Sequence, residues 1–199
     1  MKIYDISQKI YSCKVYPGDP RPERIGISSI KNGDVCNLSG FRMCAHNGTH
    51  IDAPYHFIDD GATVDKIPLE RLIGYAFVVE CNGDIGREKA EELIEKAKSV
   101  YKEPINKILI KGKATVTEDG AEVFSNAGLE LIGNESQTVG PEDAPMQVHL
   151  TLLNADVVIL EGIRLTDVPS GVYFLNAAPL NLEGGDGSPC RAVLIDFNK

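Results

Sequence analysis

The sequence lacks the signatures of several large enzyme classes. It contains no Gly-x-Ser-x-Gly nucleophile elbow, no Gly-x-x-x-x-Gly-Lys phosphate loop, no Gly-x-Gly-x-x-Gly and no His-Glu-x-x-His. These patterns serve a serine nucleophile, phosphate binding, dinucleotide binding and a zinc site on one helix, respectively. Any chemistry in this chain must therefore rest on other residues.

The chain also lacks the features of secreted and membrane proteins. It has no run of 18 apolar residues and no basic start followed by a long apolar segment, so neither membrane spanning nor secretion is indicated. Its five cysteines are odd in number and form no Cys-x-x-Cys pair, which is typical of reduced thiols. We expect a cytoplasmic protein.

Positive charge is scarce as well. The formal net charge of −9 opposes attraction to nucleic acid or anionic lipid, because phosphate binding draws on clustered Lys and Arg. We expect no nucleic-acid and no membrane partner. A small neutral or weakly charged substrate fits this charge better.

Length and patterning predict one strand-rich domain over residues 1–199. The hydrophobic content of 43% is ordinary for a globular protein, and no linker divides the chain. Strand-like runs occupy Lys2–Ile10, Arg24–Ile30, Val35–Ala45, Tyr75–Cys81, Ile105–Lys111, Gly128–Ile132, Val157–Leu160, Gly171–Ala177 and Arg191–Phe197.

Helices are predicted to be few. Apolar residues recur at helical spacing over Glu88–Tyr101, and a second helix is expected over about Glu142–Asn154. The strand-helix-strand stretch from Tyr75 to Lys111 permits some parallel pairing. The fold class expected from these elements is α/β.

All four histidines can be assigned to one group of polar residues, and three of them lie close together in the sequence. His46, His50 and His56 fall within eleven residues that also contain Asp52, and His149 stands far along the chain. Imidazole is the commonest side-chain ligand for transition metals and titrates near neutrality. The segment therefore concentrates metal-binding and proton-transfer capacity.

The spacing of this segment excludes simple regular structure. On a helix Asp52 would lie about 200° round from His50, and Pro54 would break the helix. On a flat strand His46 and His50 would be roughly 13 Å apart. Gly48 and Pro54 instead favour a bent strand end, so we place the segment at a strand-to-loop transition.

The run His46-Asn-Gly-Thr-His50-Ile-Asp52-Ala-Pro-Tyr-His56 resembles the His-x-Gly-Thr-His-x-Asp-x-Pro-x-His signature of the cyclase-type metal-dependent hydrolases. That family includes bacterial kynurenine formamidase and isatin hydrolase. The likeness covers nearly the whole chain and continues through Asp5-Ile6-Ser7, Tyr16-Pro17-Gly18-Asp19, Asp60-Gly61 to Leu69, His149 to Glu161-Gly162, and Asp186-Gly187-Ser188-Pro189 with Arg191.

The resemblance implies a layered β/β/α domain of the swivelling type and a metal site. It implies that the metal ligands are His46, His50, Asp52, His149 and Glu161, and that His56 is the catalytic acid/base. A catalytic zinc usually has three protein ligands, so five are too many for one such ion. Two divalent ions bridged by carboxylate, Zn²⁺ or Mn²⁺, would use them all.

Structural alternatives remain open for these residues. A lone histidine such as His149 is more often structural than a ligand. Glu161 follows the apolar run Val157–Leu160, so its carboxylate must emerge into solvent, pair, or bind a cation. His56 could merely pack or cap the turn.

Substrate recognition is expected at Tyr16. In the family the corresponding aromatic residue lines the substrate pocket, and Tyr16 could stack on an aromatic ring in its own site or a partner's. Tyr16-Pro17-Gly18-Asp19 also reads as a type II turn. The segment Gly133-Asn134-Glu135-Ser136 departs from the family's Gly-x-Asp-Ser and shifts a carboxylate to Glu135.

The leading hypothesis is a metal-dependent hydrolase that cleaves a C–N bond of a small aromatic amide by metal-activated water, with N-formylkynurenine as substrate. The alternatives are an isatin-type lactam hydrolase and a metal- or ligand-binding protein of the same fold without turnover. The resemblance also implies a homo-oligomer, a dimer or a tetramer.

Overall fold

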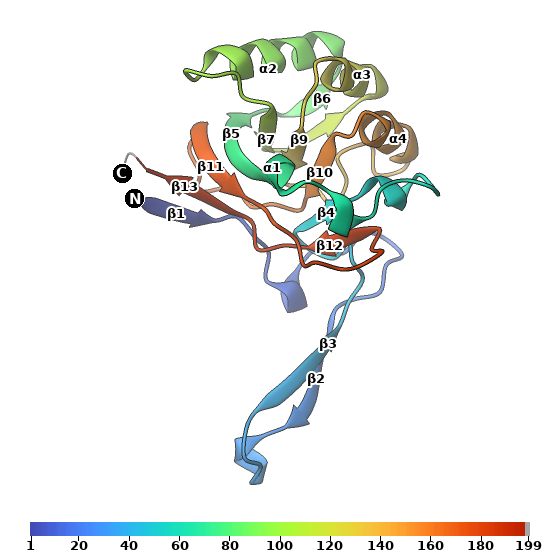
Figure 1. Ribbon diagram of the computed structural model, residues 1–199, viewed down its shortest axis with the longest axis vertical. Helices are drawn as coiled ribbons and strands as arrows, with labels where there is room; N and C mark the ends of the chain where they lie inside the picture. Colours follow the sequence, from blue (N-terminus) through green and yellow to red (C-terminus); the bar gives the residue numbers. More distant parts are fainter. Residues whose placement is uncertain (198–199) are drawn as a thin grey trace.

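The computed structural model describes residues 1–197, and a curled nine-stranded sheet forms its centre (Figure 1). The strands follow the order β1-β13-β11-β5-β7-β9-β10-β4-β12. Their bounds are β1 (Lys2–Asp5), β4 (His50–Asp52), β5 (Ile73–Glu80), β7 (Lys107–Lys111), β9 (Leu131–Asn134), β10 (Val158–Glu161), β11 (Gly171–Asn176), β12 (Gly187–Pro189) and β13 (Val193–Asp196). Because β1 pairs with β13, the first and last strands of the described residues meet in one sheet.

The centre of the sheet is parallel. Parallel pairing joins four neighbouring strands, β5, β7, β9 and β10, as the strand-helix-strand pattern predicts. The flanking strands β11 and β4 pair with this group in antiparallel orientation. β7 is buried along nearly its whole length, which explains its continuous apolar sequence. Its Ile108 and Ile110 face one core, and Leu109 faces the other.

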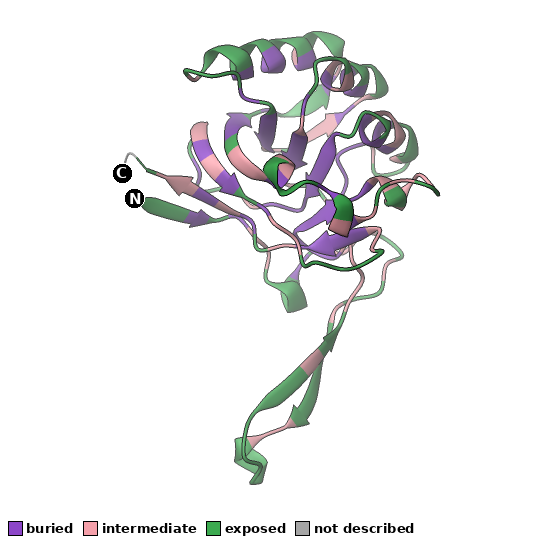
Figure 2. Ribbon diagram, in the orientation of Figure 1, coloured by how far each residue is buried: buried purple, intermediate pink, exposed green. Residues whose placement is uncertain are grey.

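Two apolar cores separate three layers (Figure 2). One core lies between the sheet and the helices α2 (Arg87–Ser99), α3 (Glu118–Asn126) and α4 (Met146–Asn154), which cover the same face. The second core lies on the other face, where the sheet curls over its own strands. The expected strand-rich, layered β/β/α architecture is confirmed.

The remaining elements are short. They are the α-helix α1 (Leu69–Leu72), the parallel pair β6 (Gly83–Ile85) and β8 (Ala114–Val116), and 3-10 turns at Ile10–Ser12, Ile30–Asn32, Pro54–His56 and Val64–Lys66. Strands β2 (Glu23–Ser28) and β3 (Leu38–Arg42) form a hairpin that projects from the body and is largely exposed (Figures 1 and 2).

Several predicted bounds were wrong. The first strand ends at Asp5, not Ile10, and a 3-10 turn follows at Ile10–Ser12. Helix α4 begins at Met146, after Pro145, rather than at Glu142. Helix α3 was missed because Gly120 is a poor helix former. The strands β4 and β12 were missed because three residues are too few to show the alternation of apolar and polar side chains that indicates a strand. Among residues 1–197, no helix has the length and apolar content of a membrane span.

Candidate metal centre and active site

Strand pairing brings a distant carboxylate to the histidine motif. β4 pairs with β10 in antiparallel, and His50 lies directly opposite Glu161. Residues opposite one another on such a pair share a face with Cβ atoms about 5 Å apart. Asp52, two residues after His50, shares that face. His50 Nε2 consequently lies 3.3 Å from Asp52 Oδ1 and 3.5 Å from Glu161 Oε2.

Helix α4 delivers the fourth histidine to the same place. His149 lies on the buried side of this helix, and its Nε2 is 3.2 Å from Glu161 Oε1 and 3.5 Å from Asp52 Oδ2. Glu161 is 2% exposed, which excludes its emergence into solvent. His149 and Glu161, which the resemblance assigns to one metal site, therefore lie in contact in the structure.

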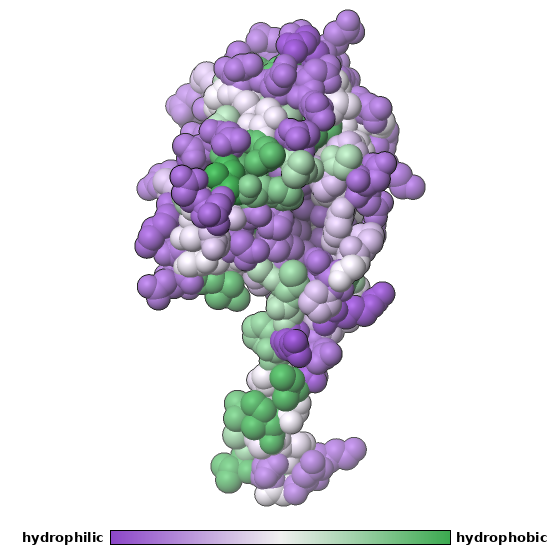
Figure 3. All heavy atoms as spheres, turned by 90° about the vertical axis from the view of Figure 1, so that its right-hand side faces the viewer, coloured by the Kyte–Doolittle hydropathy of each residue, from purple (hydrophilic) through white to green (hydrophobic). Residues whose placement is uncertain are grey.

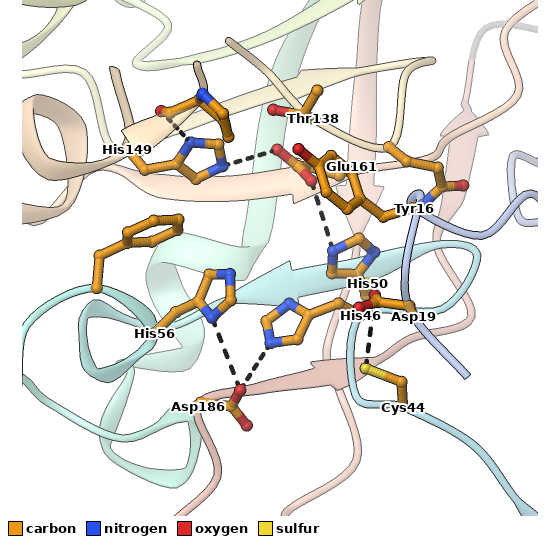
Figure 4. Close-up of a pocket in the computed structure, with 13 residues that line it drawn as sticks. Tyr16, Asp19, Cys44, His46, His50, His56, Thr138, His149, Glu161 and Asp186 are labelled. Atoms are coloured by element: carbon orange, nitrogen blue, oxygen red, sulfur yellow. Dashed lines mark hydrogen bonds and ion pairs between the residues drawn. The ribbon is translucent and has the colours of Figure 1, made fainter. Parts of the chain in front are cut away.

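His46 reaches the cluster from the turn before β4, and the 3-10 turn Pro54–His56 follows β4, as expected for a strand-to-loop transition. His46 Nδ1 lies 2.9 Å from Asp52 Oδ1. Its Nε2 lies 2.8 Å from Asp186 Oδ2 (Figure 4). The five predicted ligands thus converge at one place in the fold.

Backbone carbonyl oxygens bind the Nδ1 atoms of two of the histidines, on the side of each ring that faces away from the carboxylates. His50 Nδ1 lies 3.0 Å from the carbonyl oxygen of Gly48, and His149 Nδ1 lies 2.8 Å from that of Pro145. A carbonyl can only accept, so each Nδ1 is a donor and each Nε2 is directed at the carboxylates. Such outer contacts are typical of metal-ligating histidines.

The electrostatics of the cluster favour bound positive charge. Burial lowers the pKa of His46, but hydrogen bonds with Asp186 and Asp52 outweigh it and raise this pKa to about 11. For His149, burial is likewise outweighed by Asp52 and Glu161, and its pKa is raised to about 10. Burial and the neighbouring Asp52 raise the pKa of Glu161. Protons therefore occupy a site where metal binding would displace them.

The donor set fits a divalent metal. Three groups of described residues have ligand atoms within 4.8 Å of one another: His46 with His50 and Asp52, Asp52 with His149 and Glu161, and His46 with His56 and Asp186. Asp52 belongs to the first two of these groups. Its Oδ2 is buried, lies 3.5 Å from His149 Nε2 and accepts no hydrogen bond among the described residues. A buried carboxylate oxygen without a hydrogen bond is costly unless a cation binds it.

His56 lies beside this cluster without belonging to either group that contains Asp52. Its side chain is 29% exposed, whereas the other histidines are 1–11% exposed. Its ring stacks on His46 with centroids 3.9 Å apart, and Phe57 contacts its face edge-on at 4.4 Å. Burial lowers the pKa of His56. A neutral, partly accessible imidazole at such a place can accept a proton.

A cavity of about 380 Å³ opens over these residues and contains Tyr16 in its wall (Figure 4). The Tyr16 hydroxyl donates to the carbonyl oxygen of Glu142 at 2.7 Å. The Asp19 N–H donates to the Tyr16 carbonyl, and Gly18 has φ of +98°, which are the features of the type II turn. Tyr16 thus lies in the turn and in the cavity wall at once.

Sequence reasoning assigned no role to several other residues of the wall. Asp186, Asp19 and Thr138 line the cavity, and the buried Thr138 hydroxyl has no hydrogen-bond partner among the described residues. The run Asp186-Gly187-Ser188-Pro189, which belongs to the family resemblance, was the available signal for Asp186. Glu135 points elsewhere, because its carboxylate accepts from the N–H groups of Gly112 and Leu165.

Comparisons with known proteins show which family the chain resembles. The Cyclase family model matches residues 4–139. Kynurenine formamidase of Salinibacter ruber is 32% identical over 98% of both chains. A solved structure described as a potential metal-dependent hydrolase with cyclase activity is 30% identical, with a TM-score of 0.81 over 100% of this chain and 99% of that one.

A further solved structure shares the fold alone. It is an isatin hydrolase bound to the product analogue thioisatinate, 19% identical, with a TM-score of 0.82 over 97% of this chain and 91% of that one. Together with the full-length relatives, these matches confirm the resemblance carried by the histidine motif. The chain belongs to the Cyclase family.

Proposed function

We propose that this protein is a divalent-metal-dependent hydrolase that cleaves the C–N amide bond of a small aromatic substrate, N-formylkynurenine, to give kynurenine and formate. The observation that carries the proposal is one cavity over a buried cluster of imidazoles and carboxylates that could hold metal, with a partly exposed imidazole and two aromatic rings beside it. The full-length similarity to kynurenine formamidases supports the choice of substrate.

Two ions are proposed to bind per chain. His46 and His50 would hold one, His149 and Glu161 the other, and Asp52 would bridge both. Mixed imidazole and carboxylate donors suit Zn²⁺ or Mn²⁺. When bound, such ions lower the pKa of a coordinated water and polarise a carbonyl.

His56 is the proposed acid/base. As the oxygen of water adds to the amide carbon, His56 accepts the proton that this water releases. It then donates a proton to the leaving nitrogen as the C–N bond breaks, so one water is consumed for each amide cleaved. The lowered pKa of His56, caused by burial, keeps the ring neutral and ready to accept near neutral pH.

The cavity wall suits an aromatic substrate without excess negative charge. Tyr16 and Phe57 offer ring surfaces, whereas Asp19 and Asp186 supply carboxylates and no Lys or Arg is found among the described residues of the wall. Asp19 could pair with the ammonium group of N-formylkynurenine.

Hydrolysis of an isatin-type lactam is the second candidate. It is favoured by the absence of a cation from the described cavity wall, because N-formylkynurenine also carries a carboxylate whereas a lactam is uncharged. The fold shared with isatin hydrolases is compatible with this candidate.

A substrate panel tests the proposal. Protein loaded with Zn²⁺ or Mn²⁺ is assayed with N-formylkynurenine, isatin and formanilide, with metal content measured on the same sample. We expect the highest kcat/KM with N-formylkynurenine. Turnover of isatin alone would select the lactam hydrolase, and bound metal without turnover of any compound would identify a binding protein.

The hairpin supports the proposed homo-oligomer, a dimer or a tetramer. Ile27, Val35, Leu38 and Phe41 are each at least half exposed on this arm, where apolar residues gather (Figure 3). An isolated two-stranded hairpin is marginally stable in water, so a second copy is the proposed cover. Light scattering should show an oligomer, and Ile27→Glu should dissociate it; a monomeric wild type would refute this.

We also infer a cytoplasmic location. All five cysteines are free thiols in the structure, as the odd count predicts. Free thiols persist in a reducing compartment. Detection of the protein outside the cytoplasm of fractionated cells would overturn this inference.

A further inference from the structure

The backbone around Asp186 is held rigidly against the strand that carries the proposed ligands. The carbonyl oxygen of Asp186 accepts a hydrogen bond from the N–H of Ala53 at 3.0 Å. The next residue, Gly187, lies opposite Asp52 in the antiparallel pairing of β12 with β4. Asp186 therefore has a defined position, although 140 residues separate it from His46 in sequence.

The side chain of Asp186 contacts two histidines at once (Figure 4). Its Oδ2 lies 2.8 Å from His46 Nε2 and 3.7 Å from His56 Nδ1. A Cβ atom at Gly187 would lie only 2.5 Å from Cε1 of His46, so the absence of a side chain lets the His46 ring lie against this backbone. Asp186 and Gly187 together fix the far edge of the His46 ring.

Each of the three histidines of the proposed metal centre has one ring nitrogen beside an oxygen acceptor and the other beside the carboxylates of the cluster. Backbone carbonyl oxygens accept from the outward-facing nitrogens of His50 and His149. For His46 the acceptor in this position is the Asp186 carboxylate, and the opposite nitrogen, Nδ1, faces Asp52. The contact is partly open, since the Asp186 side chain is 47% exposed.

We propose that Asp186 is the positioning residue for His46. It accepts a hydrogen bond from Nε2–H of His46, and this bond selects the tautomer in which the Nδ1 lone pair faces Asp52 and the metal. The same oxygen lies beside Nδ1 of His56 and leaves Nε2 of His56 free toward the cavity. Carboxylate partners of this kind fix ring orientation and increase ligand basicity.

This inference rests on the proposed metal centre, and its first test requires no substrate. In ¹⁵N-labelled, Zn²⁺-loaded wild-type protein, histidine side-chain NMR should show His46 protonated on Nε2 and coordinated through Nδ1. His50 and His149 should show the opposite pattern, protonated on Nδ1. Coordination of His46 through Nε2 would overturn the proposal, because that nitrogen could not then donate to Asp186.

Variants give the second test. We expect Asp186→Ala to weaken Zn²⁺ affinity about 10–100-fold, measured by competition with a chromophoric chelator, with full stoichiometry at saturating metal. Asp186→Asn should lose less, since its amide oxygen can still accept. Glu183→Ala, an exposed change in the same loop, is the matched control and should bind as the wild type does.

The outcomes separate this proposal from the proposed function. Wild-type affinity in Asp186→Ala would overturn the positioning role. So would loss of one ion at saturating metal, which would make Asp186 a ligand, or equal losses in the Ala and Asn variants, which would indicate charge alone. Absence of Zn²⁺ binding by the wild type would refute the proposed metal centre itself, and absence of turnover with normal binding would refute only the proposed reaction.

Discussion

Replacement of His56 by alanine should abolish most of the rate while leaving the metal in place. Removal of a general acid/base typically costs 10²–10⁴-fold in kcat, which corresponds to about 2.7–5.5 kcal/mol of transition-state stabilisation. The change also removes the stack on His46 and the edge contact with Phe57, each worth about 0.5–1.5 kcal/mol of folding free energy.

The expected loss of rate and the expected loss of folding free energy distinguish a catalytic role of His56 from a packing role. A domain with about 5–15 kcal/mol of stability stays folded after losing roughly 1–3 kcal/mol, so unfolding cannot account for a rate loss of 100-fold or more. The melting temperature should fall by several degrees.

The assay measures kcat, metal content and melting temperature on one preparation. Tyr55→Ala alters an exposed ring in the same 3-10 turn and serves as the matched control, with kcat near the wild-type value. Turnover of His56→Ala near the wild-type rate at full metal occupancy would refute the acid/base role. Loss of metal would move His56 into the ligand set.

Further measurements test other parts of the structure. Metal analysis after loading should give roughly two ions per chain, and Asp52→Ala and Glu161→Ala should each lose metal as well as activity because both carboxylates lie in the cluster; full retention in both variants would contradict their roles. Thr138→Val should raise KM with metal content unchanged if substrate satisfies the unpartnered hydroxyl, and an unaltered KM would exclude that contact. The hydrogen bond from Arg191 lowers the pKa of Asp5, so its small stabilisation is present above about pH 4 and is lost as the pH falls through the lowered pKa. Asp5→Asn should therefore melt slightly lower than the wild type at pH 7, and this difference should shrink as the pH falls below 4, which thermal melts over a pH series will check.

The local geometry of the histidine motif could be predicted from the sequence, because its determinants are close together. The motif His46 to His56 contains the residues that bend the chain, and the strand-to-loop transition follows from Gly48 and Pro54. The convergence with His149 and Glu161 was available through the family resemblance. The register that sets His50 against Glu161 was not, because β4 is only three residues long.

Asp186 escaped prediction for a different reason. It lies in a glycine-containing loop with no hydrophobic period, and its role depends on the pairing of β12 with β4. Only that pairing places its carboxylate at the far edge of His46. Long-range contacts of this kind are properties of topology, which a single sequence does not specify.

The uneven exposure of the histidines fits the proposed division between metal ligands and proton carrier. The proposed ligands His50 and His149 are almost fully buried, so they are held in a dry, polar cluster where carboxylates and cations interact strongly. His56 is 29% exposed, and its ring stacks on His46. A proton carrier must exchange its proton with solvent between turnovers, which a fully buried imidazole would do slowly. In the proposed mechanism the buried histidines hold the metal, and His56, which is accessible to solvent, transfers protons.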